Sequence, residues 1–228
     1  MVPVNPIEAV LDATDRYLSS LEGVTDEQLR EPSLLPGWSR GHVVAHVALN
    51  AHGIARALRG ARTGEPVAMY DSQDARNADV EERSAGSAEE LRAFSQMSAL
   101  RLAGELRLMK AGVSIERVPD GPVMDAPTIV EARWREVEVH RADLGLGYAP
   151  TDWPLPFAAF ALEAAAADRG DQVSLTLHAH DLERTFLVGG GGHGVAGRAG
   201  DLAWWLLGRG DGSALTSTRA LPSLGAWR

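Results

Sequence analysis

Two pairs of side chains spaced four residues apart carry the strongest chemical signal in this sequence. His42 and His46 share one face of a helix expected after Ser39, and Glu136 and His140 are spaced in the same way further along. If the two helices pack in one bundle, two imidazoles and a carboxylate can converge on one ion. Three nitrogen and oxygen ligands with a fourth position open form the donor set of a catalytic zinc site.

Spacing leaves two alternatives open at this site. Either His42 or His46 could supply the imidazole from the first helix, because the two lie on one face and differ by one turn. The same pattern would also arise without any metal, if Glu136 and His140 formed a surface pair and the histidine of the first helix were simply buried in the core.

Two other motifs carry weaker signals. Residues 192–197 match the glycine pattern of dinucleotide-binding turns, but only about 30 residues follow and no acidic residue stands at the expected downstream position. We interpret this segment as a glycine-rich turn. His178 and His180 share the polar face of an expected strand, where contact with solvent explains them without a ligand role.

Composition excludes several classes of function. The net charge of −9 makes nucleic acid and anionic membrane surfaces unlikely partners. The sequence contains no cysteine, so it has no disulfide, no thiolate ligand and no thiol nucleophile of its own. Its apolar runs are too short to cross a bilayer, and we expect a cytoplasmic protein in which any thiol chemistry is imported.

The first two-thirds of the chain are expected to form a helical bundle. Apolar residues recur there at three- and four-residue spacing between capping residues and glycines. Residues 71–84 are polar and compatible with a helix, and residues 119–127 are expected to form a loop. The four long helices begin after Asn5, Ser39 and Ser87 and at Thr128, and they extend to about residues 22, 60, 111 and 144.

A change in composition after Tyr148 predicts a second domain. Three prolines fall between residues 150 and 156, and a smaller α/β unit follows them. We expect a helix over 157–169, a strand over 172–180 with a hairpin partner at 184–188, and a helix capped by Asp201. The predicted fold class is α+β, with a four-helix bundle over 1–149 and a small α/β domain over 150–228.

Several segments resemble the mycothiol-dependent maleylpyruvate isomerases, whose N-terminal domain is a DinB-like four-helix bundle. Residues 35–47 (LPGWSRGHVVAHV) resemble the first metal-binding signature of that family, and residues 135–140 (REVEVH) with 142–145 (ADLG) resemble the second. The other similar segments are residues 63–65, 69–70 and 75–77, which resemble the loop joining the helices, and 206–210 (LLGRG), which resembles the C-terminal domain.

The resemblance implies a zinc enzyme of actinobacterial type. His46, Glu136 and His140 would hold one Zn²⁺ per chain, and the thiol of mycothiol would serve as cofactor. Arg209 matches an arginine implicated in activity. The implied reaction is the cis–trans isomerisation of maleylpyruvate to fumarylpyruvate in aromatic degradation, with these small molecules as the only partners. The alternatives are a mycothiol S-transferase acting on another electrophile, and a non-catalytic protein that binds a metal or a small ligand.

Overall fold

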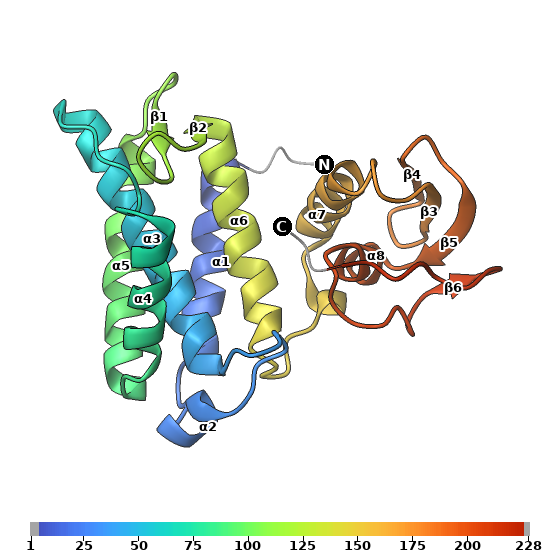
Figure 1. Ribbon diagram of the computed structural model, residues 1–228, viewed down its shortest axis with the longest axis horizontal. Coiled ribbons are helices and arrows are strands. Elements are labelled where there is room, and N and C mark those ends of the chain that lie inside the picture. Colours follow the sequence, from blue (N-terminus) through green and yellow to red (C-terminus); the bar gives the residue numbers. More distant parts are fainter. Residues whose placement is uncertain (1–4, 226–228) are drawn as a thin grey trace. The chain divides into compact units, whose positions relative to one another are not determined.

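The structure, a computed structural model, describes residues 5–225 and contains two compact units, residues 1–147 and 148–228 (Figure 1). The first unit is almost entirely helical, and the second combines two helices with a four-stranded sheet, so the expected α+β class is confirmed. Within residues 5–225, no helix is both long enough and apolar enough to cross a membrane.

Four long helices form the bundle of the first unit. Polar side chains cap them: Asn5, Ser39, Ser87 and Asp125 each accept a hydrogen bond from a backbone N–H of the first turn. Helix α3 packs against α5 and α6, and α1 packs against α6 and α5. The long helices are α1 (Pro6–Ser20), α3 (Arg40–Thr63), α5 (Ala88–Leu108) and α6 (Ala126–Asp143), and the short ones are α2 (Asp26–Arg30) and α4 (Gln73–Ser84).

Helix α3 is the central element of the bundle, and small residues let its neighbours approach closely. A Cβ atom at Gly41 would lie 2.7 Å from the carbonyl oxygen of Ser84, and one at Gly53 would lie 3.0 Å from that of Met69. These contacts bring the segment that contains α4 against α3. The consequence is that side chains of the α4 segment can reach residues in the middle of α3.

The connection before α6 differs from the predicted loop. Strands β1 (Ser114–Glu116) and β2 (Val123–Asp125) form an antiparallel hairpin, so the loop expected over residues 119–127 is only partly a loop. Helix α6 begins at Ala126 rather than at Thr128. The reason is that Asp125 accepts a hydrogen bond from the Thr128 N–H at 3.0 Å, which makes Asp125 the capping residue.

The second unit packs helices against a small mixed sheet. Its strand order is β4–β3–β5–β6, with β3 and β5 parallel and the two outer strands antiparallel to their neighbours. Helices α7 and α8 pack against each other, and both contact the sheet. The elements are the 3₁₀ helix η1 (Pro150–Asp152), α7 (Leu155–Asp168), β3 (Leu175–Ala179), β4 (Arg184–Val188), β5 (His193–Gly197), α8 (Ala199–Leu206) and β6 (Thr216–Ser217).

Two sequence predictions in this unit need correction. Helix α8 starts at Ala199, two residues before the expected cap Asp201, because the Ala199 N–H donates to the distant Asp181 at 2.8 Å. The glycine motif at 192–197 lies mostly in strand β5 rather than in a turn. Gly192 is needed there for close approach, since a Cβ atom would lie only 2.1 Å from the carbonyl oxygen of Ser174.

Candidate metal centre

The structure brings His46, Glu136 and His140 together in the helical unit. His46 lies on α3, and Glu136 and His140 lie one turn apart on α6. Glu136 Oε2 is 2.9 Å from His46 Nε2 and 3.3 Å from His140 Nε2. One potential ligand atom from each residue lies within 4.8 Å of the other two, and no other such group occurs within residues 5–225.

This group has the donor set of a metal site. The two imidazole rings stand nearly perpendicular, at an angle of 84° with centroids 4.7 Å apart. Glu136 Oε2 is buried and forms no hydrogen bond of acceptable geometry, despite its short contacts to both rings. A buried carboxylate oxygen without a hydrogen-bond donor is costly unless a cation compensates it. Two imidazoles and a carboxylate therefore fit a divalent ion such as Zn²⁺ with a further position open.

Asp143 supports this group from behind His140. It is fully buried, and its Oδ2 atom accepts a hydrogen bond from His140 Nδ1 at 2.8 Å. This bond leaves His140 Nε2 directed toward Glu136. Imidazoles that bind metals usually donate their second N–H to a carboxylate in this way, which fixes the tautomer and the orientation of the ring.

Arg76 and Trp38 border the group on the His46 side. Arg76 lies on α4, and its Nη2 atom donates a hydrogen bond to His46 Nδ1 on α3 at 2.6 Å. The Nε atom of the same guanidinium is buried without a hydrogen-bond partner. The Trp38 ring meets the His46 ring edge-on, with centroids 5.5 Å apart. Arg76 is thus a cationic group that lies directly beside the potential ligands.

Burial and charge act in opposite directions on the three titrating side chains. Burial lowers the pKa of His46 despite the nearby Glu136. Burial also acts to lower the pKa of His140, but the hydrogen bond to Asp143 and the negative charge of the nearby Glu136 outweigh it and raise that pKa to about 9. Burial would raise the pKa of Glu136, yet the two imidazoles hold it well below its usual value. The site therefore favours an anionic Glu136 next to positive charge.

A buried polar network fixes α6 against α3. The Arg133 side chain is fully buried, and its Nη1 atom donates to the carbonyl oxygen of Val47 at 2.9 Å and to Asn50 Oδ1 at 2.8 Å. On the other side of α6, buried Glu138 pairs with Arg16 of α1 at 2.8 Å. These contacts set the rotation of α6, which decides that Glu136 and His140 face His46.

His42 takes no part in the group. Its Nδ1 atom accepts a hydrogen bond from the Ser39 backbone N–H at 3.3 Å, which completes the capping box at the start of α3. Its Nε2 atom lies 3.2 Å from both Glu81 Oε2 and Ser84 Oγ on α4. The structure thus gives His42 a local role in holding the start of α3 to α4.

Arg209 lies in the second unit, directly after α8. Gly208 and Gly210 flank it with positive φ angles of 72° and 69°, a conformation that strongly favours glycine. Its guanidinium lies over the Trp204 ring, 5.5 Å from the centroid, and its Nη1 atom donates to the carbonyl oxygen of Leu207 at 3.3 Å. The side chain is therefore held by its own unit.

Sequence reasoning missed Asp143 and Arg76 as site residues. Asp143 follows His140 by three positions on the same helix, so its spacing was a usable signal. Arg76 is 30 positions from His46, and only the packing of α4 on α3 brings the two together. The exposed His178 contacts Thr185 on the neighbouring strand, and it lies outside any potential metal group among the described residues.

Comparison with known proteins identifies relatives of this chain. The family model of the mycothiol maleylpyruvate isomerase N-terminal domain matches residues 10–145. The chain is also similar to crystal structures of the mycothiol-dependent maleylpyruvate isomerase and of a mutant of it, each with a TM-score of 0.87 at 26% identity. The similarity covers 97% of this chain and 95% of each solved chain. No curated protein sequence matches the chain.

Proposed function

Since the chain belongs to the mycothiol maleylpyruvate isomerase family, we propose that it converts maleylpyruvate to fumarylpyruvate with a bound Zn²⁺ ion and the thiol of mycothiol. The observation that carries this proposal is the convergence of His46, Glu136 and His140, together with a buried Glu136 oxygen that has no hydrogen-bond partner. These three residues would hold the ion, one per chain.

The zinc ion and mycothiol would supply nucleophilic chemistry that this chain lacks. The protein has no cysteine, and a divalent ion near a thiol lowers its pKa so that the thiolate persists at neutral pH. Reversible addition of that thiolate to the cis carbon–carbon double bond would allow rotation and return the trans isomer, with the thiol regenerated and no net change in atoms or electrons.

The chain's own residues position the reactants. Asp143 holds the His140 ring through its Nδ1 atom, and the packing of α6 on α3 fixes Glu136 between the two imidazoles. Maleylpyruvate carries two carboxylates, and negative charge develops on its enolate oxygen during addition, so cationic partners are needed. Arg76 beside His46 is suited to this role in the helical unit, and Arg209 is our candidate from the second unit.

Product analysis with and without mycothiol tests the proposal. Zinc-loaded protein is incubated with maleylpyruvate, and fumarylpyruvate is followed by its absorbance and by chromatography. We expect turnover only when both thiol and metal are present. Glu136→Ala should abolish turnover, whereas Glu131→Ala, an exposed carboxylate on the same helix, should retain it. Isomerisation without thiol would overturn the mechanism, and accumulation of a stable thioether would indicate an S-transferase instead.

A further inference from the structure

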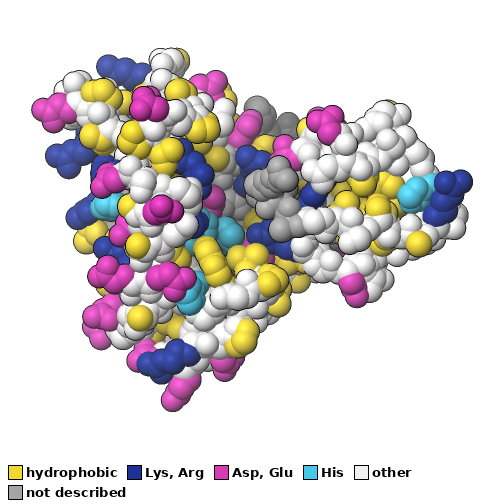
Figure 2. Space-filling model, viewed as in Figure 1, with side chains coloured by type: hydrophobic (Ala, Val, Ile, Leu, Met, Phe, Trp, Pro, Cys, Tyr) yellow, Lys and Arg dark blue, Asp and Glu magenta, His cyan; other side chains and the backbone are white. Residues whose placement is uncertain are grey.

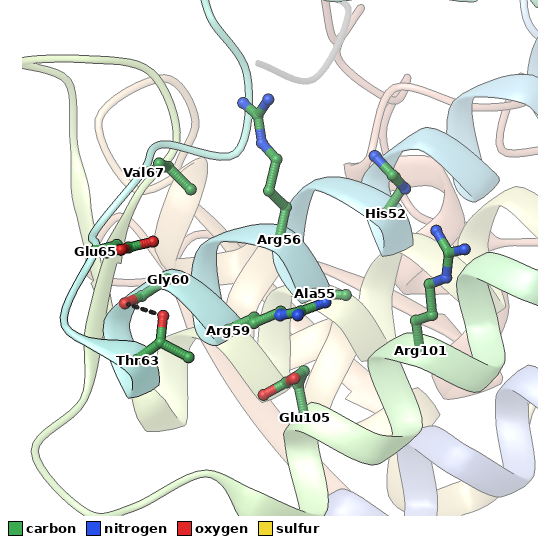
Figure 3. A pocket seen from close by; sticks show the side chains of 10 residues that line it. All are labelled: His52, Ala55, Arg56, Arg59, Gly60, Thr63, Glu65, Val67, Arg101 and Glu105. Carbon is green, nitrogen blue, oxygen red and sulfur yellow. Dashed lines mark hydrogen bonds between the residues drawn. The ribbon is translucent and has the colours of Figure 1, made fainter.

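A groove of about 540 Å³ lies between α3 and α5 in the helical unit (Figure 3). Three arginines and one histidine line it, together with Glu65, Glu105 and small or apolar residues. It shares no residue with the group formed by His46, Glu136 and His140. Its lining is more basic than the chain as a whole, which carries a net charge of −9. Figure 2 shows acidic side chains spread over the helical unit on the face in view.

Two of the lining arginines form no ion pair, although Arg59 lies near enough to Glu105 to help lower the pKa of that carboxyl. Arg62 pairs with both carboxylate oxygens of Glu105, at 2.8 and 2.9 Å, which neutralises that glutamate. Arg56 is likewise paired, with Asp71 at 3.0 Å. Among the residues that the structure describes, Arg59 and Arg101 form no ion pair.

These two guanidinium groups are directed into the groove from opposite helices. Figure 3 shows Arg59 of α3 extending toward the α5 side, and Arg101 of α5 rising toward His52, whereas Arg56 points away. His52 is half-buried at the same end of the groove. Burial lowers the pKa of His52, and Arg101, Arg56 and Arg83 lower it further, against a smaller opposing effect of Asp79. The potential at this end of the groove is therefore positive.

We propose that Arg59, Arg101 and His52 form a binding site for a small molecule that carries a doubly charged oxyanion, either a phosphate group or a pair of carboxylates. Guanidinium groups bind such oxygens in paired, charge-assisted hydrogen bonds, and two guanidinium groups supplied to one groove by different helices suit a dianion. The site lies outside the metal group, and its ligand is a further ligand of this protein rather than part of the isomerisation.

The test is a titration with inorganic phosphate at pH 7.5 and constant ionic strength, followed by the assigned ring NMR signals of the histidines. We expect a saturable shift of the His52 signal and a rise in the pKa of His52, because a bound dianion favours the imidazolium. The signal of exposed His178 should stay constant. The signals of His46 and His140 report separately on any binding at the metal group.

Matched variants assign the binding to the groove. Arg59→Gln and Arg101→Gln should each weaken phosphate binding about tenfold, the effect of losing one charge-assisted contact. Arg107→Gln removes the same charge from an exposed position on the same helix and should leave binding unchanged. These positions are exposed, so we expect all three variants to fold, which circular dichroism would verify.

A parallel titration with succinate separates the two ligand sources. Tighter binding of phosphate would identify a phosphate group as the natural ligand chemistry, and tighter binding of succinate would identify a dicarboxylate. A non-saturable shift with both anions, or equal weakening by Arg107→Gln and Arg101→Gln, would overturn the proposal.

Discussion

Asp143 orients His140, one of the three proposed metal ligands. It is fully buried, and its hydrogen bond to His140 Nδ1 is one of the two contacts that hold the pKa of His140 at about 9. We predict that Asp143→Ala weakens zinc binding about 10- to 100-fold, because His140 loses its orientation and basicity. Competition with a chromogenic chelator measures this affinity.

The same substitution has a defined effect on protonation. In the metal-free protein, NMR titration should show the pKa of His140 falling below about 9 in Asp143→Ala, since one of the groups that raise it is gone. Because the pKa of His140 is raised in the folded protein, its protonation stabilises the fold fully at pH values below the ordinary histidine pKa. This stabilisation is lost as the pH rises through about 9. Glu131→Ala on the same helix serves as the control. Unchanged zinc affinity in Asp143→Ala would show that the hydrogen bond has no influence on the site.

The hydrogen bond between Arg76 and His46 is expected to break when a metal binds His46. The Arg76 Nη2 atom donates to His46 Nδ1, which therefore carries no proton. When a metal binds neutral His46 at Nε2, the ring proton must lie on Nδ1, where it can no longer accept from Arg76. The guanidinium then becomes available to another acceptor, and we infer that this is a substrate carboxylate.

We predict that Arg76→Gln raises the KM for maleylpyruvate about tenfold or more and leaves the bound zinc in place. Steady-state kinetics and metal analysis of the same sample measure the two effects. Arg107→Gln, which changes the charge equally, should leave the KM unaltered. A normal KM in Arg76→Gln would exclude Arg76 from substrate binding.

Part of this arrangement could be read from the sequence. The i,i+4 spacing predicted that Glu136 and His140 share a helical face, but spacing could not choose between His42 and His46. The choice depends on where α6 lies along α3, which the contacts of buried Arg133 with Val47 and Asn50 help to set. Such a contact between distant segments leaves no periodic pattern in the chain.

At the scale of elements, the first turn of α3 matters most for the metal group, because it directly precedes His46. The His42 ring completes the capping box with Ser39 and contacts α4, one turn before His46. We predict that His42→Ala lowers the free energy of unfolding by about 1 kcal/mol, the usual effect of losing a helix cap. Urea unfolding of His42→Ala, Ser39→Ala and the double variant measures it.

The double-variant comparison identifies the cause. If the two side chains act as one cap, the combined loss should be smaller than the sum of the single losses. Additive effects, or an unchanged stability in His42→Ala, would contradict the capping role.

The long helices were predictable because each has a polar cap and a repeating apolar face. The four predicted long helices correspond to α1, α3, α5 and α6. The β1–β2 hairpin was missed because its strands contain only three residues each, too few to show an alternating pattern. The start of α8 was misplaced because its first N–H bonds to Asp181, which is 18 positions away.

At the scale of the whole molecule, the two groups that we assign to the proposed reaction belong to different units. The helical unit carries the metal group, and the second unit carries Arg209 in a turn between two glycines with positive φ. We predict that Arg209→Gln lowers turnover about a hundredfold, as loss of a donor to a developing oxyanion does, without loss of zinc. Kinetics with Arg184→Gln, an arginine on a strand of the same unit, provide the comparison. Equal turnover of wild type and Arg209→Gln would remove this residue from the mechanism.

The central claim is that His46, Glu136 and His140 bind one metal ion, and metal analysis of purified variants tests it most directly. We predict about one zinc per chain in the wild type and in His42→Ala. His46→Ala, Glu136→Ala and His140→Ala should each lose the ion, because two remaining protein ligands hold it too weakly against solvent. Full zinc occupancy in His46→Ala, or loss of zinc in His42→Ala, would contradict the claim.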